Sequence, residues 1–194
     1  PGIGLWVANA APTEARGTDL TGKVLVGYQG WHLARNDGSP YGGWFHWFQN
    51  KSRADYANIG VEMYPDMSQY DHDEKYPTEM KMPDGSTAYL YSHFNPKTVQ
   101  RHFQWMKDYG IDGAFVQRFT HELHKPEQFA QKNTVLASSR MAAEAAQVLF
   151  AVRYDMTGHR DTTVEADLQK DWVYLVKTLK ITSSPNYLRH DGKP

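Results

Sequence analysis

Short apolar runs alternate with amphipathic segments along most of the chain. Four runs have the length and composition of buried strands, at residues 23–28, 88–92, 111–117 and 148–154. Apolar positions at helical spacing predict helices over 96–109, 134–147 and 163–180. Asn95 and Pro96 supply a helix-start signal for the first helix, and Gly110 supplies its stop signal.

This order of elements predicts an α/β fold with a parallel sheet, because strands buried on both faces alternate with helices. Two architectures fit the pattern: an open doubly wound sheet, or part of a (β/α)8 barrel. Residues 1–22 form an irregular lead-in in this interpretation. Residues 29–87 form a polar connection that is long for a compact domain, and loops of this length are usually functional. No glycine-rich phosphate loop follows a predicted strand, so nucleotide binding is not supported.

Polar and aromatic residues recur where the predicted strands end. In both architectures, ligands bind at the carboxyl ends of the strands. They are Tyr28, Gln29 and Trp31 after the first run, His93 after the second, Gln117 and Arg118 after the third, and Arg153, Tyr154 and Asp155 after the fourth. Hydrogen-bonding groups beside aromatic rings suit a polyhydroxylated ligand. We therefore expect the four strand ends to share a site for a small polar molecule.

Structural roles remain open for several of these residues. Gln117 and Arg118 can pair with a carboxylate, Asp155 can cap a turn or hold Arg153, and His93 can bond a loop carbonyl. Glu122 lies in the polar stretch HELHKPEQ, where a solvated surface position is expected. That stretch lacks the histidine pair of a zinc-binding helix, so we expect neither a metal site nor a cofactor.

The long connection contains a second aromatic cluster, WFHWF. Its Trp44, His46 and Trp47 can wall a cleft, or they can anchor the connection to the rest of the fold. Asp66, further along, can close an Asx turn or face a sugar hydroxyl.

Composition narrows the classes of partner. The chain has 194 residues and a formal net charge of -1, so it offers no general basic character for nucleic acid. It contains no run of 18 apolar residues, so we expect no membrane-spanning helix. Cysteine is absent, which removes disulfides and cysteine-type zinc sites. Aromatic residues make up 13%, and their rings are platforms for the C–H face of a pyranose.

Several segments resemble glycoside hydrolase families 71 and 99, particularly bacterial family-99-like proteins labelled xylosidase/arabinosidase. These segments are KVLVGYQGW, GWFHWF, YPDMSQYD, AYLYSHFNPKTVQRHFQWMKDYGIDGAFVQRF and VRYDMTG, and the resemblance spans about residues 20–194. It implies a (β/α)8 TIM barrel and a secreted or periplasmic enzyme that acts on glycans; family 99 includes endo-α-mannosidases. The resemblance also implies a sugar cleft lined by Tyr28, Trp31, the Trp44–Trp47 cluster, His93, Gln117, Arg118, Tyr154 and Asp155.

The chain is short for such a barrel, which typically needs about 250 residues. We therefore expect residues 23–194 to be the N-terminal half, with the first four βα units. In family 99 the paired catalytic glutamates lie later, so by resemblance they fall beyond Pro194 and this chain lacks them. Asp155 is then the candidate catalytic carboxylate.

The expected function is a glycoside hydrolase-like protein that acts on or binds a glycan. A non-catalytic carbohydrate-binding or half-barrel assembly module is the alternative, and an open α/β domain for a polar metabolite is a third. A half barrel exposes an unpaired sheet edge, which favours self-association.

Overall fold

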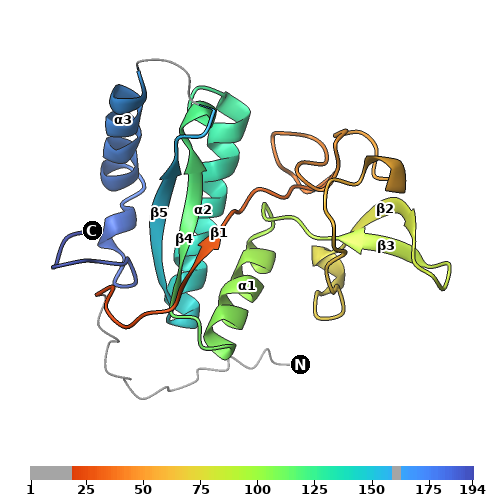
Figure 1. Cartoon of the computed structure of the whole chain (residues 1–194), viewed down its shortest axis with the longest axis horizontal. Helices are drawn as coiled ribbons and strands as arrows, with labels where there is room; N and C mark the ends of the chain where they lie inside the picture. The colour runs from red at the N-terminus through yellow and green to blue at the C-terminus, as the bar shows by residue number, and fades with distance from the viewer. Residues whose placement is uncertain (1–18, 159–162) are drawn as a thin grey trace, which may run out of the picture.

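The computed structural model describes residues 19–158 and 163–194. Its centre is a parallel sheet in the order β1–β4–β5, made of β1 (Leu25–Tyr28), β4 (Gly113–Phe119) and β5 (Leu149–Asp155). Three helices accompany it: α1 (Pro96–Asp108), α2 (Pro126–Ala146) and α3 (Val164–Lys177). A hairpin of β2 (Tyr76–Lys81) and β3 (Thr87–Leu90) lies apart from the sheet, beyond α1 (Figure 1).

The predicted helices form, with one boundary corrected. The side chain of Asn95 accepts a hydrogen bond from the backbone N of Lys97 at 3.0 Å, and Pro96 opens α1 as predicted. Gly110 follows the helix with a left-handed φ of 75°. However, α2 begins at Pro126, well before the predicted residue 134. The pattern does not predict these first turns because they are polar and carry no apolar spacing.

The strand predicted over 88–92 forms as β3, but it belongs to the other sheet. It pairs antiparallel with β2, and Tyr76 lies opposite Leu90. The first predicted strand, β1, instead pairs directly with β4 in parallel. The prediction of four strands in one parallel sheet is therefore wrong, and β2 was missed inside the long connection. A four-residue apolar run looks the same in a hairpin and in a parallel sheet, so the sequence pattern could not separate them.

Residues 29–95, which we call the insert, connect β1 to α1 and have a core of their own. Trp44, Phe48, Met80 and Leu90 are buried there, together with Trp47. The main core lies between the parallel sheet and the helices. Its central members are Val99, Phe103, Val116, Val135 and Phe150.

A repeating strand–helix order emerges once the insert is set aside. The order is β1–α1, β4–α2 and β5–α3, followed by a short segment at residues 186–188. That segment runs parallel to β5: the N of Phe150 donates to the carbonyl of Asn186 at 3.0 Å, and the N of Leu188 donates to the carbonyl of Phe150 at 2.8 Å. Residues 186–188 therefore occupy the next sheet position, as in a (β/α) barrel.

Close packing of β4 on β5 depends on one glycine. A Cβ added to Gly113 would lie 2.5 Å from the carbonyl oxygen of Leu149, so no other residue fits without moving a strand. Within the described residues, no helix is long and apolar enough to cross a membrane.

The sheet has two faces, because successive side chains of a strand point to opposite sides. We call the side that carries Tyr28, Val116 and Arg118 the helix face, since these residues contact α1, α2 or α3. We call the other side, which carries Gln117 and Arg153, the inner face.

Candidate functional site

Three polar side chains join across the inner face where β4 and β5 end. The Gln117 Nε2 donates to Asp155 Oδ2 at 2.8 Å, and Arg153 Nη2 donates to Gln117 Oε1 at 2.6 Å. Gln117 is buried and Arg153 is exposed. A Cβ added to Gly27 would lie 3.7 Å from Arg153 Nη1, so the guanidinium extends over β1 as well.

Asp155 is held as a carboxylate. Hydrogen bonds from the side chain and the backbone of Thr157 lower the pKa of Asp155 below its usual value. The Thr157 N lies 2.8 Å from Asp155 Oδ1, while Gln117 holds the other oxygen. The group therefore presents a fixed negative charge beside an exposed positive one, which suits hydrogen bonding to hydroxyl groups.

An aromatic stack adjoins this carboxylate. Trp31 stacks on His46 with ring centroids 4.2 Å apart, and it lies parallel to Phe119 at 5.9 Å. Phe119 ends β4 directly opposite Asp155 in the strand register. Burial lowers the pKa of His46 to about 4, so this ring is neutral at neutral pH. We call Trp31, His46 and Phe119 the aromatic stack.

A buried ion pair lies just beyond the end of β4. Glu122 Oε2 and Lys132 Nζ are 3.5 Å apart, and the two side chains are each 4% exposed. The ammonium also lies 5.7 Å from the Phe119 ring centroid, and burial lowers the pKa of Lys132. The expectation of a solvated Glu122 is therefore wrong. The early start of α2 brings Lys132 inward, and the turn Thr120–Glu122 brings the carboxylate to it.

Arg118 and Tyr154 lie on the helix face instead of joining Gln117. Arg118 forms two hydrogen bonds to Asp171 of α3, at 2.7 and 2.6 Å, and one to Asn133 of α2 at 2.9 Å. The Tyr154 hydroxyl donates to the same carboxylate at 2.5 Å, and burial followed by Asp171 raises the pKa of Tyr154. This network ties β4 and β5 to their helices, which is the structural role that the sequence left open for Arg118.

Tyr28 and His93 lie in a buried cluster of rings between α1 and the insert. The Tyr28 hydroxyl is 3.0 Å from His102 Nδ1, and the Tyr70 hydroxyl is 2.7 Å from His102 Nε2. His93 Nδ1 accepts from the backbone N of His32 at 3.1 Å. Burial lowers the pKa of His102 to about 4 and that of His32 to about 3. The structure therefore does not bring Tyr28 to Gln117 and Asp155.

The remaining predicted residues are divided between the core and the surface. Trp44 and Trp47 are 1% and 3% exposed, and Trp47 Nε1 donates to the Tyr91 carbonyl at 2.8 Å, so both anchor the insert. Gln29 is half-buried, and its Oε1 has no hydrogen-bond partner among the described residues. Asp66 lies on the surface of the insert, where its Oδ1 accepts from the Ser68 N at 2.8 Å in an Asx turn.

Among the network residues that the sequence analysis did not name, three show which positions a sequence signal can find. Phe119 shares a face with Gln117 by the two-residue period of a strand, and this period could have found it. Asp171 interrupts the apolar side of a predicted helix, which is a signal for a buried partner. Lys132 precedes the predicted start of its helix and carried no signal.

One acidic group has the spacing of a metal site but already has cationic partners. Asp71, Asp73 and Glu74 place their oxygens within 4.8 Å of one another. Lys97 Nζ lies 2.8 Å from both aspartates, and Arg101 pairs with Glu74. The exposed Asp19, His190 and Asp191 form the other such group in the described ranges. We assign no metal ion to either.

No protein-family model and no curated protein sequence matches the chain. Among solved structures, the chain is similar to the GH99 endo-α-mannosidase from Bacteroides thetaiotaomicron in complex with bis-tris-propane, at 14% identity and a TM-score of 0.52, covering 88% of this chain and 40% of that chain. Another structure of a GH99 endo-α-mannosidase from that organism has 16% identity and a TM-score of 0.47, with 88% and 43% covered.

The first of these similarities shows the fold. This chain has a GH99-like, TIM-barrel-related fold and spans about two-fifths of the length of that enzyme. At 14% identity, the similarity does not carry the activity across.

Proposed function

We propose that this chain is part of a glycoside hydrolase that binds a glycan on the inner face, at the ends of β1, β4 and β5. The observation that carries the proposal is the aromatic stack beside an ionised Asp155. A pyranose ring can pack its C–H face on such rings while its hydroxyls bond the carboxylate and the Arg153 guanidinium. The fold shared with an enzyme named as an endo-α-mannosidase supports this substrate class.

The proposal includes a place for the chain within a barrel. Residues 23–194 would form the N-terminal half after a lead-in at 1–22, of which 1–18 lie outside the described residues. The three strand–helix pairs and the segment 186–188 support this assignment. Membership of families 71 and 99, the xylosidase/arabinosidase type, secreted or periplasmic localisation and independence from cofactors belong to the same proposal.

Asp155 has the chemistry of a binding group in this proposal. Thr157 and Gln117 stabilise its charged form, so at neutral pH Asp155 accepts hydrogen bonds and does not donate a proton. Glycoside hydrolysis requires an acid and a second carboxylate. Glu122 is committed to Lys132, so it does not supply that partner. We therefore propose that this chain contributes glycan binding to the hydrolase and lacks the catalytic carboxylate pair.

A non-catalytic carbohydrate-binding or half-barrel assembly module is the second candidate. The stabilised charge of Asp155 and the ion pair of Glu122 favour it, because both suit binding more than turnover. Light scattering tests the assembly part of this candidate: a dimer formed through the inner face is expected to dissociate when glycan binds there.

Binding and hydrolysis measured on one sample test the proposal. The probes are manno- and xylo-oligosaccharides on an array, alongside aryl glycosides. We expect binding by the wild type and a loss of about tenfold or more in Asp155→Asn, because a charged hydrogen bond contributes about 1.5–3 kcal/mol. Asp84→Asn, at the exposed hairpin turn, is the matched control and should bind normally. A wild type that binds none of these glycans, or that hydrolyses the aryl glycosides, would overturn the proposal.

A further inference from the structure

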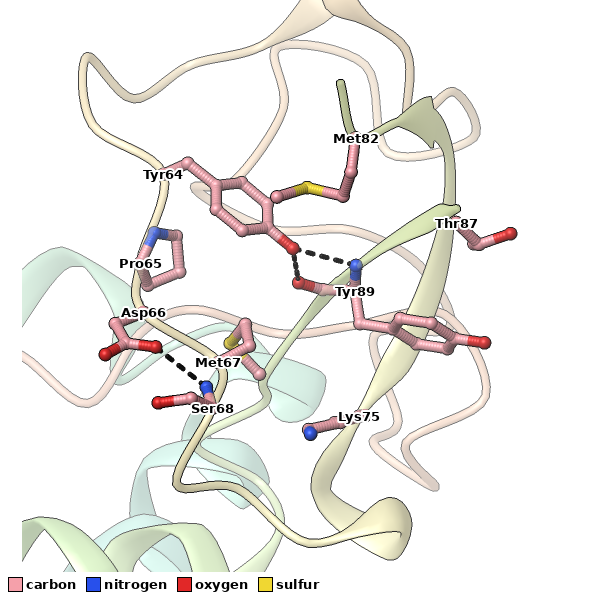
Figure 2. Close-up of a pocket in the computed structure, with 9 residues that line it drawn as sticks. All are labelled: Tyr64, Pro65, Asp66, Met67, Ser68, Lys75, Met82, Thr87 and Tyr89. Carbon is pink, nitrogen blue, oxygen red and sulfur yellow. Dashed lines mark hydrogen bonds between the residues drawn. The ribbon is translucent and has the colours of Figure 1, made fainter. Parts of the chain in front are cut away.

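A second pocket lies on the insert, between two walls. One wall is the segment that carries Tyr64, Asp66 and Ser68, and the other is the hairpin region that carries Lys75 and Tyr89 (Figure 2). The volume is about 430 Å³, within the range of about 300–1,000 Å³ that small-molecule sites occupy. The hairpin stands beyond α1 from the parallel sheet (Figure 1), so this pocket is separate from the inner face.

Hydrogen bonds hold the pocket walls in place without any ligand. The Tyr64 hydroxyl accepts from the backbone N of Tyr89 at 2.9 Å and donates to the Tyr89 carbonyl oxygen. These two bonds fasten one wall to the other. Asp66 Oδ1 accepts from the Ser68 N at 2.8 Å, which fixes the direction of the carboxylate. A pocket with fixed walls loses little conformational entropy when a ligand enters.

The charged groups of the pocket remain available to a ligand. No ion pair joins Asp66 to Lys75 among the described residues. Hydrogen bonds from Ser68, followed by the charge of Lys75, lower the pKa of Asp66, so the carboxylate is ionised at neutral pH. The pocket thus offers an acceptor on one wall and a donor on the other.

The rest of the lining is apolar and partly exposed. Tyr64 and Tyr89 are each 37% exposed, and Met82 also lines the pocket (Figure 2). An exposed aromatic surface next to opposed charges suits a ligand that has both an apolar face and polar edges.

We propose that this pocket binds one saccharide unit of a glycan, with the ring against Tyr89 and its hydroxyls between Asp66 and Lys75. A phosphate or other anion is disfavoured because Asp66 would repel it. A purely apolar ligand would desolvate Asp66 and Lys75 without giving them partners. The inference does not depend on the function proposed for the inner face.

Two-dimensional amide NMR can locate binding at each site separately. The probes are xylotriose, mannotriose and, as a zwitterion, free L-leucine. We expect a trisaccharide to shift the amides of Ser68 and Thr87 in a saturable manner. Shifts of the amides of Gln117 and Arg153 report the inner face independently, so failure at one site is distinguishable from failure at the other. A shift of Ser68 and Thr87 with leucine alone, or with none of the probes, would overturn the inference.

Matched variants test the residues named. Tyr89→Ala removes the ring, and Asp66→Asn removes the charge while its amide oxygen still accepts from the Ser68 N. We expect each to weaken the trisaccharide affinity measured at Ser68 about tenfold. Tyr109→Ala is the control, because Tyr109 is 76% exposed and lies outside the pocket. Unchanged affinity in both pocket variants, with the remaining amide spectrum intact, would contradict the proposed contacts.

Discussion

The two faces of the parallel sheet use neighbouring residues for different purposes. Arg118 points to the helix face, where it is 2% exposed and bonded to α2 and α3. Gln117, one residue earlier, points to the inner face and holds Asp155 beside the exposed Arg153. A shift of one position along a strand therefore separates a side chain that holds the fold together from one that can support a ligand site.

The two faces also differ in the charge of their titratable groups. On the helix face, Arg118 is neutralised by Asp171, and burial keeps His102 uncharged. On the inner face, Asp155 carries a charge that hydrogen bonds stabilise. We therefore expect substitutions on the helix face to reduce stability first, and substitutions on the inner face to reduce binding first.

The largest expected effect is at Asp171. Asp171→Asn keeps the shape of the side chain but leaves the buried Arg118 without a counter-charge. Removal of one partner from a buried pair costs about 3–5 kcal/mol, and we expect a loss of that size in the free energy of unfolding. Urea unfolding followed by far-ultraviolet circular dichroism measures it.

Two controls accompany this measurement. Arg153→Ala removes an arginine from the inner face and should cost less than about 1 kcal/mol, because that side chain is exposed. The double variant Arg118→Met/Asp171→Leu should recover part of the stability lost in Asp171→Asn, since both charges of this pair are removed while the Tyr154 hydroxyl loses its acceptor. Equal losses for Arg153→Ala and Asp171→Asn would remove the distinction between the two faces.

The next effect is a loss of stability in mild acid. The unfolded chain protonates its histidines near pH 6.5, whereas burial holds the pKa of His102 at about 4 and that of His32 at about 3 in the folded chain. Stability is thus fully present above pH 6.5 and falls as the pH decreases toward 4. Between pH 7 and pH 5 we expect a loss of about 2 kcal/mol for each such histidine.

Urea midpoints at several pH values test this dependence. His72→Gln, a substitution of an exposed histidine, should follow the wild-type curve. The stability of His102→Gln should decrease less steeply over the same range, because the unfolded variant has one histidine fewer to protonate. A stability that does not change between pH 7 and pH 5 would mean that the buried histidines titrate normally.

The third effect concerns the buried pair beyond β4. Glu122→Gln leaves the Lys132 ammonium buried and without its counter-charge. We expect a loss of about 2 kcal/mol, smaller than for Asp171, because the two groups are 3.5 Å apart and form no hydrogen bond by geometry. The double variant Glu122→Gln/Lys132→Met should be more stable than the single one. A single variant as stable as the wild type would show that Lys132 sheds its proton or reaches water.

Local signals made part of the fold predictable. Asn95, Pro96 and Gly110 determine the ends of α1 through hydrogen bonding and backbone freedom that involve only neighbouring residues. The hairpin was not predictable in the same way. Whether the run at 88–92 pairs with β1 or with β2 depends on residues outside the run. The sequence of the run itself does not distinguish the two pairings.

The candidate site divides similarly. The sequence placed Gln117, Arg153 and Asp155 at strand ends, and the structure joins them. It also placed Arg118 and Tyr154 there, although the two-residue period of a strand puts them on the other face from Gln117 and Asp155. The Glu122–Lys132 pair depends on the start of α2 and on a turn, neither of which leaves a periodic pattern.

The smallest change in stability, and the sharpest test of the two faces, is expected at Gln117. Gln117→Leu keeps the volume of a buried side chain but removes both of its hydrogen bonds. Arg153 is exposed and Asp155 still accepts from the Thr157 N, so each can bond water instead, and the free energy of unfolding should change by less than about 1 kcal/mol. Glycan affinity should nevertheless fall about tenfold, because Asp155 loses one of the two bonds that fix its position. Calorimetric titration with the tightest-binding array glycan, beside urea unfolding, measures both quantities. A variant that loses stability and keeps its affinity would place Gln117 with Arg118 among the structural residues and leave the inner face without a positioned carboxylate.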